Sequence, residues 1–277
     1  MTTYQTLRVR PTDPGVLTVA IDAPPMNLIG PELVRDLVTL LGELESGDDV
    51  RVVVLETADR DFFVPHVDLT KIAEYTAEAA KAGGSDDASL GMLLHRFSTL
   101  PVVLIGKLRG RARGAGSELL LASDMRFAAQ ENAIIGQPEI GFGALPGAGG
   151  MQHLARLLGR GRAMEAILGG DDFTAEEAER YGWVNRALPD AELDEFVARL
   201  ARRIASFPPE AVRVVKETLN DLTLPPAESI RADARTFRRL AATESLKDRS
   251  AVLFADGLQT RGVLELELGD RIGSLGS

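Results

Sequence analysis

Two glycine-rich stretches of this sequence each carry a glutamate, and they are the strongest candidates for chemistry in the chain. The first, GRARGAGSELLLASD over residues 110–124, places Glu118 just ahead of an apolar helical run. The second, GQPEIGFGALPGAGG over residues 136–150, crowds glycines around Glu139. Two carboxylates held on separate turns could act as a general base and a general acid. An isolated acid is more often a solvated surface charge, so neither glutamate identifies a site by itself.

The first stretch also predicts backbone hydrogen-bond donors. A strand expected to end near Gly110 leads through a tight glycine turn into a helix that starts around residues 116–118. The first N–H groups of a helix lack intrahelical partners and carry the positive end of the dipole. Such a turn can therefore aim an amide at an oxygen that is becoming negative. Close packing of the helix on a sheet is the alternative purpose of these glycines, and the cluster alone leaves both open.

Composition and spacing exclude several other kinds of site. The second stretch is not a nucleotide loop, because Pro146 stands where the dinucleotide fingerprint needs its third glycine and no Gly-Lys-Ser/Thr follows. The chain has no cysteine, and its three histidines, at 66, 95 and 153, lack metal-ligand spacing, so we expect no metal. A formal net charge of −10 disfavours nucleic acid as a partner. We assign His95 and His153, which lie in apolar helical surroundings, to packing.

The N-terminal residues MTTYQTLRVR lack the apolar core of a signal peptide. No apolar run approaches the roughly 20 residues that span a bilayer. We therefore expect a soluble cytoplasmic protein with no membrane partner.

The elements that must position the two glutamates follow from periodicity. Short β-branched runs predict strands at 15–22, 50–56 and 101–110, and two shorter ones within DMRFAA and NAIIG. Residues 30–47 carry leucines at helical spacing, with Pro31 in the first turn and Gly47 at the end. We interpret residues 73–89, rich in Ala, Gly and charge, as a mobile surface segment.

After residue 150 the pattern becomes helical, with a possible capping box formed by Thr174 and Glu177. From Asp190 to about Gly257 almost every segment predicts helix, with interruptions at Pro208-Pro209 and Pro225-Pro226. We therefore divide the chain into an α/β part over 1–190, which holds the candidate site, and a helical part over 191–277.

Four motifs, in order, resemble the enoyl-CoA hydratase/isomerase (crotonase) superfamily. GRARGAGSELLLASD looks like its Gly-x-Ala-x-Gly-Gly-Gly-x-Glu-Leu segment, and GQPEIGFGALPGAGG resembles its Pro-Glu-x-x-x-Gly-x-x-Pro-Gly-x-Gly-Gly segment. APPMNLIGPEL is similar to the family's Pro-x-x-Asn-Ala-Leu turn, and RDFFVPHVDL stands at its Phe-x-x-Gly-x-Asp-Leu loop. The resemblance covers roughly residues 5–220 and implies an α/β crotonase-like ββα spiral with a C-terminal helical region. That region packs on neighbouring subunits in the family, which implies a homotrimer or a dimer of trimers.

The resemblance also implies a reaction. Family members polarise the carbonyl of an acyl-CoA thioester with two backbone N–H groups, which by motif are those of Val67 and Ala115. In the hydratases two glutamates hold the water that adds to the conjugated double bond, and these correspond to Glu118 and Glu139. No metal or redox cofactor is implied, since coenzyme A is part of the substrate. The positions implied to contact that substrate are Met26, His66, Asp68 and Leu69.

Some residues depart from the family pattern. Pro65-His66 replaces the usual Ala-Gly ahead of Val67, and Ala115 replaces the middle glycine of the triplet. His66 could touch substrate or share proton transfer, but we favour the alternative in which it only shapes the pocket wall. The family's usual closing Lys-Arg-x-Pro-x-Phe pattern is missing, and Arg261 is a weak substitute for its coenzyme A contacts.

A basic run, KLRGRARG, places Lys107, Arg109, Arg111 and Arg113 at alternate positions. These side chains could meet coenzyme A phosphates or a substrate carboxylate, but the favoured alternative is that they pair with acids of this acidic chain or face solvent. Trp183 we assign to structure.

We therefore predict an enoyl-CoA hydratase, a hydro-lyase that adds water reversibly to a 2-enoyl-CoA. The alternatives are another acyl-CoA reaction on the same scaffold, such as double-bond isomerisation or thioester hydrolysis, and a non-catalytic acyl-CoA-binding protein.

Overall fold

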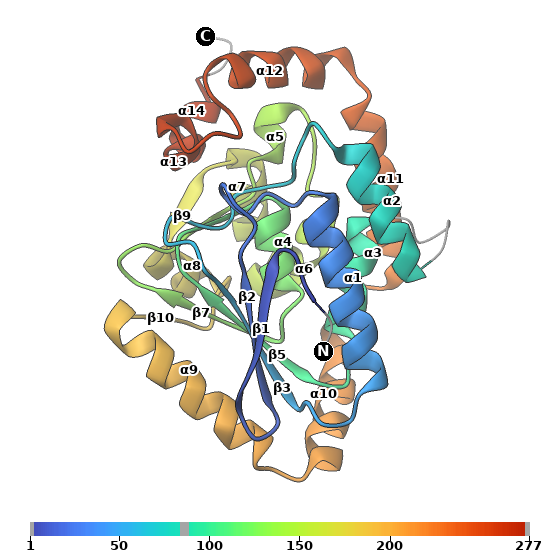
Figure 1. Ribbon diagram of the computed structural model, residues 1–277. Helices are drawn as coiled ribbons and strands as arrows, with labels where there is room; N and C mark the ends of the chain where they lie inside the picture. The colour runs from blue at the N-terminus through green and yellow to red at the C-terminus, as the bar shows by residue number, and fades with distance from the viewer. Residues whose placement is uncertain (1–2, 84–88, 275–277) are drawn as a thin grey trace.

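A six-stranded sheet forms the centre of the protein, whose computed structural model describes residues 3–83 and 89–274 (Figure 1). The strands lie in the order β1-β2-β3-β5-β7-β10, with β1 antiparallel to β2 and every other neighbouring pair parallel. Their bounds are β1 Leu7–Asp13, β2 Val16–Ile21, β3 Val52–Thr57, β5 Val103–Leu108, β7 Met125–Ala129 and β10 Arg186–Leu188. The expected strands at 15–22, 50–56 and 101–110 are confirmed as β2, β3 and β5.

A second, four-stranded sheet carries the site. Its order is β4-β6-β8-β9, with the first three strands parallel and β9 antiparallel. The bounds are β4 Phe62–Val64, β6 Arg111–Arg113, β8 Ile134–Gly136 and β9 Asp172–Thr174. The carboxyl ends of parallel strands meet at one edge of a sheet, where α/β proteins place their ligand sites. The chain that leaves β4, β6 and β8 at this edge is therefore brought together.

Eight helices of the described chain precede residue 190. They are α1 Pro31–Ser46, α2 Ile72–Gly83, α3 Leu90–Ser98, α4 Ala115–Leu121, α5 Glu139–Phe142, α6 Gly150–Leu158, α7 Arg160–Gly169 and α8 Ala175–Tyr181. The predicted first helix is confirmed, with Pro31 at its first position and Gly47 as its C-cap. The Thr174–Glu177 capping box is also present.

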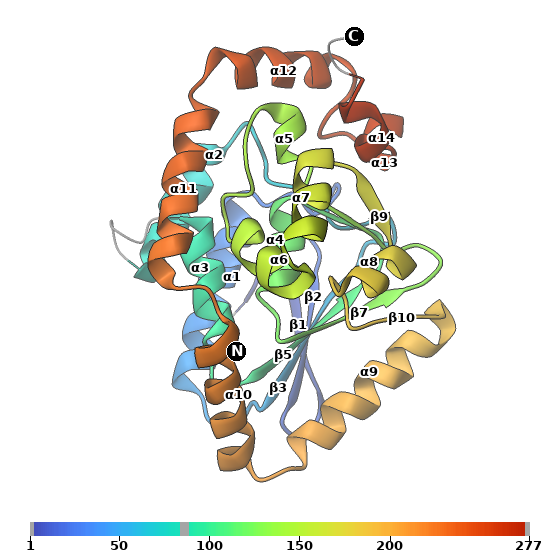
Figure 2. The same cartoon turned by 180° about the vertical axis from the view of Figure 1, so that it is seen from behind.

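The C-terminal helices run around the core. They are α9 Asp190–Ala205, α10 Pro209–Thr223, α11 Ala227–Ala241, α12 Glu244–Ala255, α13 Val263–Leu266 and α14 Leu268–Ile272. Seen from behind, α10 and α11 follow one side, α12 crosses the top and α13 and α14 descend on the other (Figure 2). Helix α9 packs on the six-stranded sheet, burying Leu193 and Val197 against residues such as Val52 and Ile105. None of the helices described in the structure is long and apolar enough to cross a membrane.

The interpretation of residues 73–89 as a mobile surface segment is wrong for most of its length. Residues up to Gly83 belong to α2, which packs against α1 and buries Tyr75 and Ala79. These two side chains are one helical turn apart, so they form a single buried face on a helix whose other described side chains are half-buried or exposed. Residues 84–88 lie outside the described part of the chain.

Candidate active site

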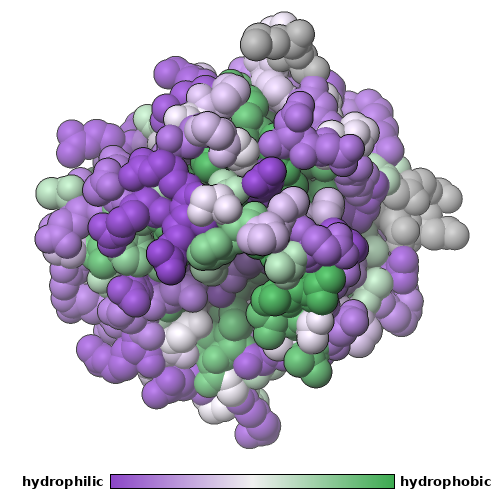
Figure 3. Space-filling model, turned by 90° about the horizontal axis from the view of Figure 1, so that it is seen from below, coloured by the Kyte–Doolittle hydropathy of each residue, from purple (hydrophilic) through white to green (hydrophobic). Residues whose placement is uncertain are grey.

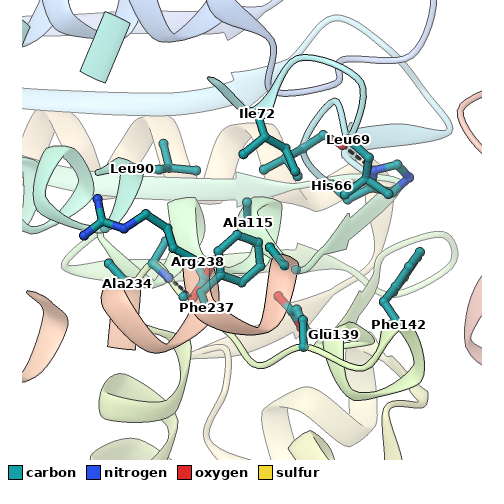
Figure 4. A pocket seen from close by; sticks show the side chains of 18 of the residues that line it. His66, Leu69, Ile72, Leu90, Ala115, Glu139, Phe142, Ala234, Phe237 and Arg238 are labelled. Carbon is teal, nitrogen blue, oxygen red and sulfur yellow. Dashed lines mark hydrogen bonds between the residues drawn. The ribbon is translucent and has the colours of Figure 1, made fainter. Parts of the chain in front are cut away.

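A largely apolar pocket lies at the carboxyl edge of the four-stranded sheet (Figure 4). Its walls come from the loop after β4 and from α2, α3, α4 and α5, and the C-terminal helices α11 and α12 complete it. Apolar lining residues include Leu69, Ile72, Leu90, Phe142, Ala234 and Phe237. Figure 4 shows the carboxylate of Glu139 pointing into this cavity below Ala115. An apolar enclosure with a few convergent polar groups is the usual form of a small-molecule site.

Glu118 is buried in the first turn of α4, at the base of this pocket. Its Oε1 accepts hydrogen bonds from the backbone N–H groups of Ala148 at 2.7 Å and Gly150 at 2.8 Å. A side chain at Gly150 would place its Cβ 3.0 Å from this oxygen, so glycine allows the close approach. Burial raises the pKa of Glu118 to about 7, although the two backbone donors act in the opposite direction.

Glu139 begins α5, directly after the turn that leaves β8. Burial and the nearby negative charge of Glu118 raise the pKa of Glu139 well above its usual range. With the Gln137 amide turned so that its nitrogen faces the carboxylate, that nitrogen lies 3.0 Å from both oxygens of Glu139. Two carboxyls that influence each other in this way titrate as a pair. Near neutral pH such a pair can present one carboxylate and one carboxylic acid.

A buried chain of hydrogen bonds holds Glu139 in place. In the same orientation the Gln137 carbonyl oxygen accepts from Ser117 Oγ at 3.3 Å, and Trp183 Nε1 donates to Ser117 Oγ at 3.2 Å. Gln137, Ser117 and Trp183 are all fully buried. Trp183, which we assigned to structure, therefore supports the acid through two intermediaries. Gln137 was not among the residues singled out from the sequence, although it directly precedes the Pro-Glu of the motif.

The backbone around Val67 leaves one N–H free to face the pocket. Ile29 N donates to His66 O at 3.1 Å, and Asp68 N donates to Ile29 O at 3.0 Å. In a trans peptide the N–H points opposite to the C=O, so the Val67 N–H points away from Ile29. Among the described residues it has no hydrogen-bond partner.

A second backbone donor starts α4. Ala115 N is the first N–H of that helix, where no intrahelical acceptor exists. Gly114 precedes it with φ 52°, and a Cβ there would lie 3.0 Å from Glu139 Oε1. Gly116 follows it so close to β4 that a Cβ would lie 1.9 Å from Val64 O. The glycines therefore serve both purposes considered from the sequence: they allow close packing, and they set the position of the Ala115 amide.

The structure brings most of the predicted site residues to one pocket. The lining includes Val67, Ala115, Glu118 and Glu139, together with His66 and Leu69. Two others lie outside it. Asp68 bonds its own loop, accepting from Thr70 N at 2.9 Å and Thr70 Oγ1 at 2.6 Å, and Met26 is fully buried in the interior.

Both ring nitrogens of His66 are bound to protein. Nδ1 lies 2.8 Å from Val67 O, and Nε2 lies 2.9 Å from Glu265 Oε1. Neither nitrogen is left to reach a substrate, which favours the pocket-wall role over proton transfer. Glu265 is fully buried and lies 199 residues along the chain, and no motif in the sequence pointed to it.

The basic run pairs with acids, as favoured from the sequence. Lys107 bonds Glu56 and Asp194, and Arg109 bonds Asp190 and Asp194. Beyond the turn at Gly110, where φ is 66°, Arg113 makes a two-pronged contact with Asp172 at 2.7 and 2.6 Å. Arg111 donates instead to the backbone oxygen of Leu266.

Two further expectations concern Arg261, the weak substitute for the family's coenzyme A contacts, and metal-binding side chains. Arg261 is held by Asp59 and Asp61. In the described part of the chain no group of three or more metal-binding side chains is present.

Comparison with known proteins gives a consistent result. The chain is 32% identical over 237 residues to the short-chain-enoyl-CoA hydratase of Clostridium acetobutylicum, covering 84% of this chain and 88% of that protein. It superposes on the crystal structure of a protein named "putative enoyl-CoA hydratase" from Streptomyces avermitilis with a TM-score of 0.98 at 60% identity, covering 100% and 99% of the two chains. On an enoyl-CoA hydratase from Bacillus anthracis the TM-score is 0.72 at 29% identity, covering 95% and 100%.

These likenesses confirm the crotonase-like fold expected from the sequence. Residues 12–261 match the sequence profile described as enoyl-CoA hydratase/isomerase. This chain therefore belongs to the enoyl-CoA hydratase/isomerase family.

Proposed function

We propose that the protein is an enoyl-CoA hydratase, a hydro-lyase that adds water reversibly across the C2–C3 double bond of a 2-enoyl-CoA thioester. The observation that carries the proposal is that one pocket is lined by two carboxyls with raised pKa values and by Val67 and Ala115, whose backbone N–H groups have no hydrogen-bond partner among the described residues. Relatives that share the fold and 30% or more of the sequence carry the same activity in their names.

The amides of Val67 and Ala115 act on the thioester carbonyl. As water attacks C3, negative charge develops on the thioester oxygen, and two donors fixed in advance stabilise that charge. They accelerate the reaction because the oxygen is more negative in the transition state than in the bound substrate. Removing one well-placed donor of this kind costs roughly 10²–10³-fold in kcat.

The two glutamates complete the addition. One carboxylate takes a proton from water as the oxygen bonds to C3, and the other carboxyl gives its proton to C2. The atoms balance, because one water adds and the pair of acids ends with the same number of protons. Glu118 suits the base because two backbone N–H groups stabilise its charged form. Glu139, whose pKa is pushed up by the charge of Glu118, suits the acid.

The most direct assay follows the ultraviolet band of the conjugated thioester. We expect the protein to bleach this band with a short 2-enoyl-CoA and to form a product heavier by one water. A flat trace with acyl chains of several lengths would remove the hydratase assignment. Isomerisation would move the double bond without adding water, and thioester hydrolysis would release free coenzyme A, so product analysis distinguishes both. A non-catalytic binding protein would retain the acyl-CoA unchanged.

We further propose that the protein works as a homotrimer or a dimer of trimers, with residues 191–277 on the neighbouring subunits. Helix α10 supports this with four exposed apolar side chains, Val214, Val215, Leu219 and Leu222. Figure 3 shows apolar patches on the lower face of the molecule, near α9 and α10. Light scattering coupled to gel filtration would measure the assembly. A cytoplasmic location and independence of any metal or redox cofactor stay predictions.

A further inference from the structure

The segment over residues 258–272, which includes α13 and α14, closes against the loop that carries Val67. Its apolar side chains form a separate cluster with Phe142 of α5 and with Leu69, and the cluster contains Leu258, Leu264, Leu268 and Ile272. Arg113 anchors the segment from the other side, because its buried Nη1 donates to Glu265 O at 2.6 Å. Gly269 lies so close to β9 that a Cβ would stand 2.6 Å from the Asp172 backbone nitrogen. The C-terminal segment is therefore firmly attached beside the pocket.

Two polar side chains of this segment reach the Val67 loop. Glu265 Oε1 lies 2.9 Å from His66 Nε2, and it also accepts from Gln259 N at 2.7 Å. Gln259 Nε2 donates to Val67 O at 3.2 Å, beside the contact from His66 Nδ1 at 2.8 Å. The carbonyl of Val67 is thus held by His66 and Gln259, and Glu265 contacts both of these residues.

The backbone conformation of Gln259 indicates that its contacts with Glu265 and Val67 are firmly fixed. Its φ is 63°, a left-handed value that a residue with a Cβ adopts at a cost. Backbone in such a state persists when the surrounding contacts determine it. Here both the main-chain nitrogen and the side-chain amide of Gln259 are used, the first by Glu265 and the second by Val67.

Glu265 is held in its charged form, which strengthens its hydrogen bonds to His66 and Gln259. Burial alone would raise the pKa of this carboxyl, but the adjacent His66, the Gln259 N–H and nearby Arg113 together hold the pKa below its usual range. The two ring nitrogens of His66 face a carbonyl oxygen and a carboxylate oxygen, both of which are hydrogen-bond acceptors. The ionised carboxylate therefore fixes the orientation of the ring.

We propose that Glu265, acting through His66 and together with Gln259, is a positioning residue that holds the Val67 carbonyl and so keeps the N–H of the preceding His66–Val67 peptide pointed at the substrate's thioester oxygen. The inference rests on the proposed function for the role of that N–H. Ile29 fixes the peptides on both sides of Val67 from one direction. The C-terminal segment fixes the Val67 carbonyl from the other. Glu265 contacts His66 and Gln259, and these two residues hold the Val67 carbonyl. The C-terminal segment therefore supports the oxyanion hole through these two residues, and the role needs no contact between Glu265 and the substrate.

The test compares Glu265→Leu, which removes the acceptor, with Glu265→Gln, which keeps an acceptor oxygen for His66 and Gln259. Glu267→Gln is the matched control, because Glu267 lies on the same segment but pairs with Arg271 at the surface. We expect Glu265→Leu to lower kcat by about 10-fold or more while KM changes by less than about 3-fold, as for a contact made mainly in the transition state. Glu265→Gln should retain more of kcat, and Glu267→Gln all of it.

A spectroscopic readout separates this role from general stability. Hydrogen bonds to a thioester carbonyl lower its stretching frequency, so a saturated acyl-CoA with a ¹³C-labelled carbonyl reports the oxyanion hole directly in difference infrared spectra. We expect the bound band to move back toward its solution frequency in Glu265→Leu and to stay in place in Glu267→Gln. A folded Glu265→Leu with wild-type kcat and an unmoved band would overturn the proposal.

Gln259→Gly covers the case in which Glu265→Leu does not fold. Glycine accepts a positive φ without strain and keeps the backbone N–H to Glu265, but it loses the contact to Val67 O. We expect a smaller fall in kcat, about 2–5-fold for one neutral hydrogen bond, with a partial shift of the band. Wild-type kcat and an unmoved band in Gln259→Gly would then overturn the proposal. If the wild-type protein hydrates no enoyl-CoA, the proposed function fails, and the carbonyl band still decides this inference.

Discussion

The two sheets of this protein have different roles: the six-stranded sheet forms a stable core, and the four-stranded sheet carries the pocket. The six-stranded sheet is covered by helices, and its interior positions are apolar residues such as Val52 and Ile105. The four-stranded sheet has strands of only three residues on its parallel side, and each ends in a turn that carries polar or glycine residues. The first sheet obtains stability from buried apolar area. The second sheet places buried carboxyls and backbone N–H groups in one pocket, where their burial lowers the stability of the fold. The buried apolar area of the first sheet offsets that loss.

The comparison predicts that changes at the edge of the small sheet reduce rate more than stability. Glu139→Gln should lower kcat by about 10²-fold or more, because it removes a general acid while keeping the volume of the side chain. The melting temperature should not fall. Enoyl-CoA bleaching and thermal denaturation of the same preparation measure both quantities. The control is Glu192→Gln, an exposed acid of α9. Full hydratase activity in Glu139→Gln would refute the assignment of that residue.

The opposite result is expected in the large sheet. Ile105 of β5 is fully buried in the cluster that includes Leu193 and Val197 of α9, so Ile105→Ala should lower the free energy of unfolding by about 2–5 kcal/mol. The kcat of the protein that remains folded should stay close to wild type, since Ile105 does not line the pocket. Urea denaturation and an active-site titration at low temperature would measure the two effects separately. A large fall in kcat with unchanged stability would break the division of labour between the sheets.

Glu118 affects both the catalytic rate and the stability of the protein, and its effect on stability depends on pH. Its pKa is about 7 in the folded protein and near 4.5 when unfolded, so the folded state binds the proton more tightly. Ionisation of Glu118 therefore opposes folding above about pH 7, and the effect vanishes below about pH 4.5, where the carboxyl is protonated in both states. Glu118→Gln should be more stable than wild type at pH 8 by about 1–3 kcal/mol, with a smaller difference at pH 5. Denaturant unfolding at the two pH values measures this, and an equal difference at both would contradict it.

The smallest expected effect concerns the support of Glu139. Gln137→Leu removes the amide next to both oxygens of Glu139 and should lower kcat by about 10-fold, the loss expected for one hydrogen bond to the negative charge that Glu139 gains as it gives up its proton. It should also raise the apparent pKa of the acidic pair, because that amide stabilises the charged form of Glu139. The pH profile of kcat distinguishes this from a general loss of structure. A lower kcat with an unchanged profile would mean that Gln137 does not act on Glu139.

Much of this arrangement could be predicted from local sequence. The strands, the first helix and the two glycine turns follow from periodicity and from residues such as Pro31 and Gly114, whose conformational properties act locally. The shared pocket of Glu118 and Glu139 was expected from the resemblance. The acid partners of Lys107 and Arg109 were expected in kind but not by name, because ion pairs between residues far apart in the sequence leave no local pattern.

The features that sequence did not predict all depend on distant contacts. The interpretation of α2 as a surface segment rested on its content of Ala, Gly and charged residues, and only its contact with α1 shows which face is buried. Glu265 stands in a short acidic-apolar run, LELELGD, where nothing distinguishes it from Glu267. Its burial against His66 is set by the docking of the whole C-terminal segment. Such contacts become visible only when the fold has brought distant parts of the chain together.

The central claim is that two main-chain amides and two acids surround one thioester, and a crystal structure of Glu139→Gln with a bound 2-enoyl-CoA tests it most directly. The account predicts that the thioester oxygen accepts hydrogen bonds of about 2.7–3.1 Å from the N–H groups of both Val67 and Ala115, with residues 118 and 139 on either side of C2 and C3. A thioester oxygen that meets neither amide, or an acyl chain that occupies a different cavity, would contradict it.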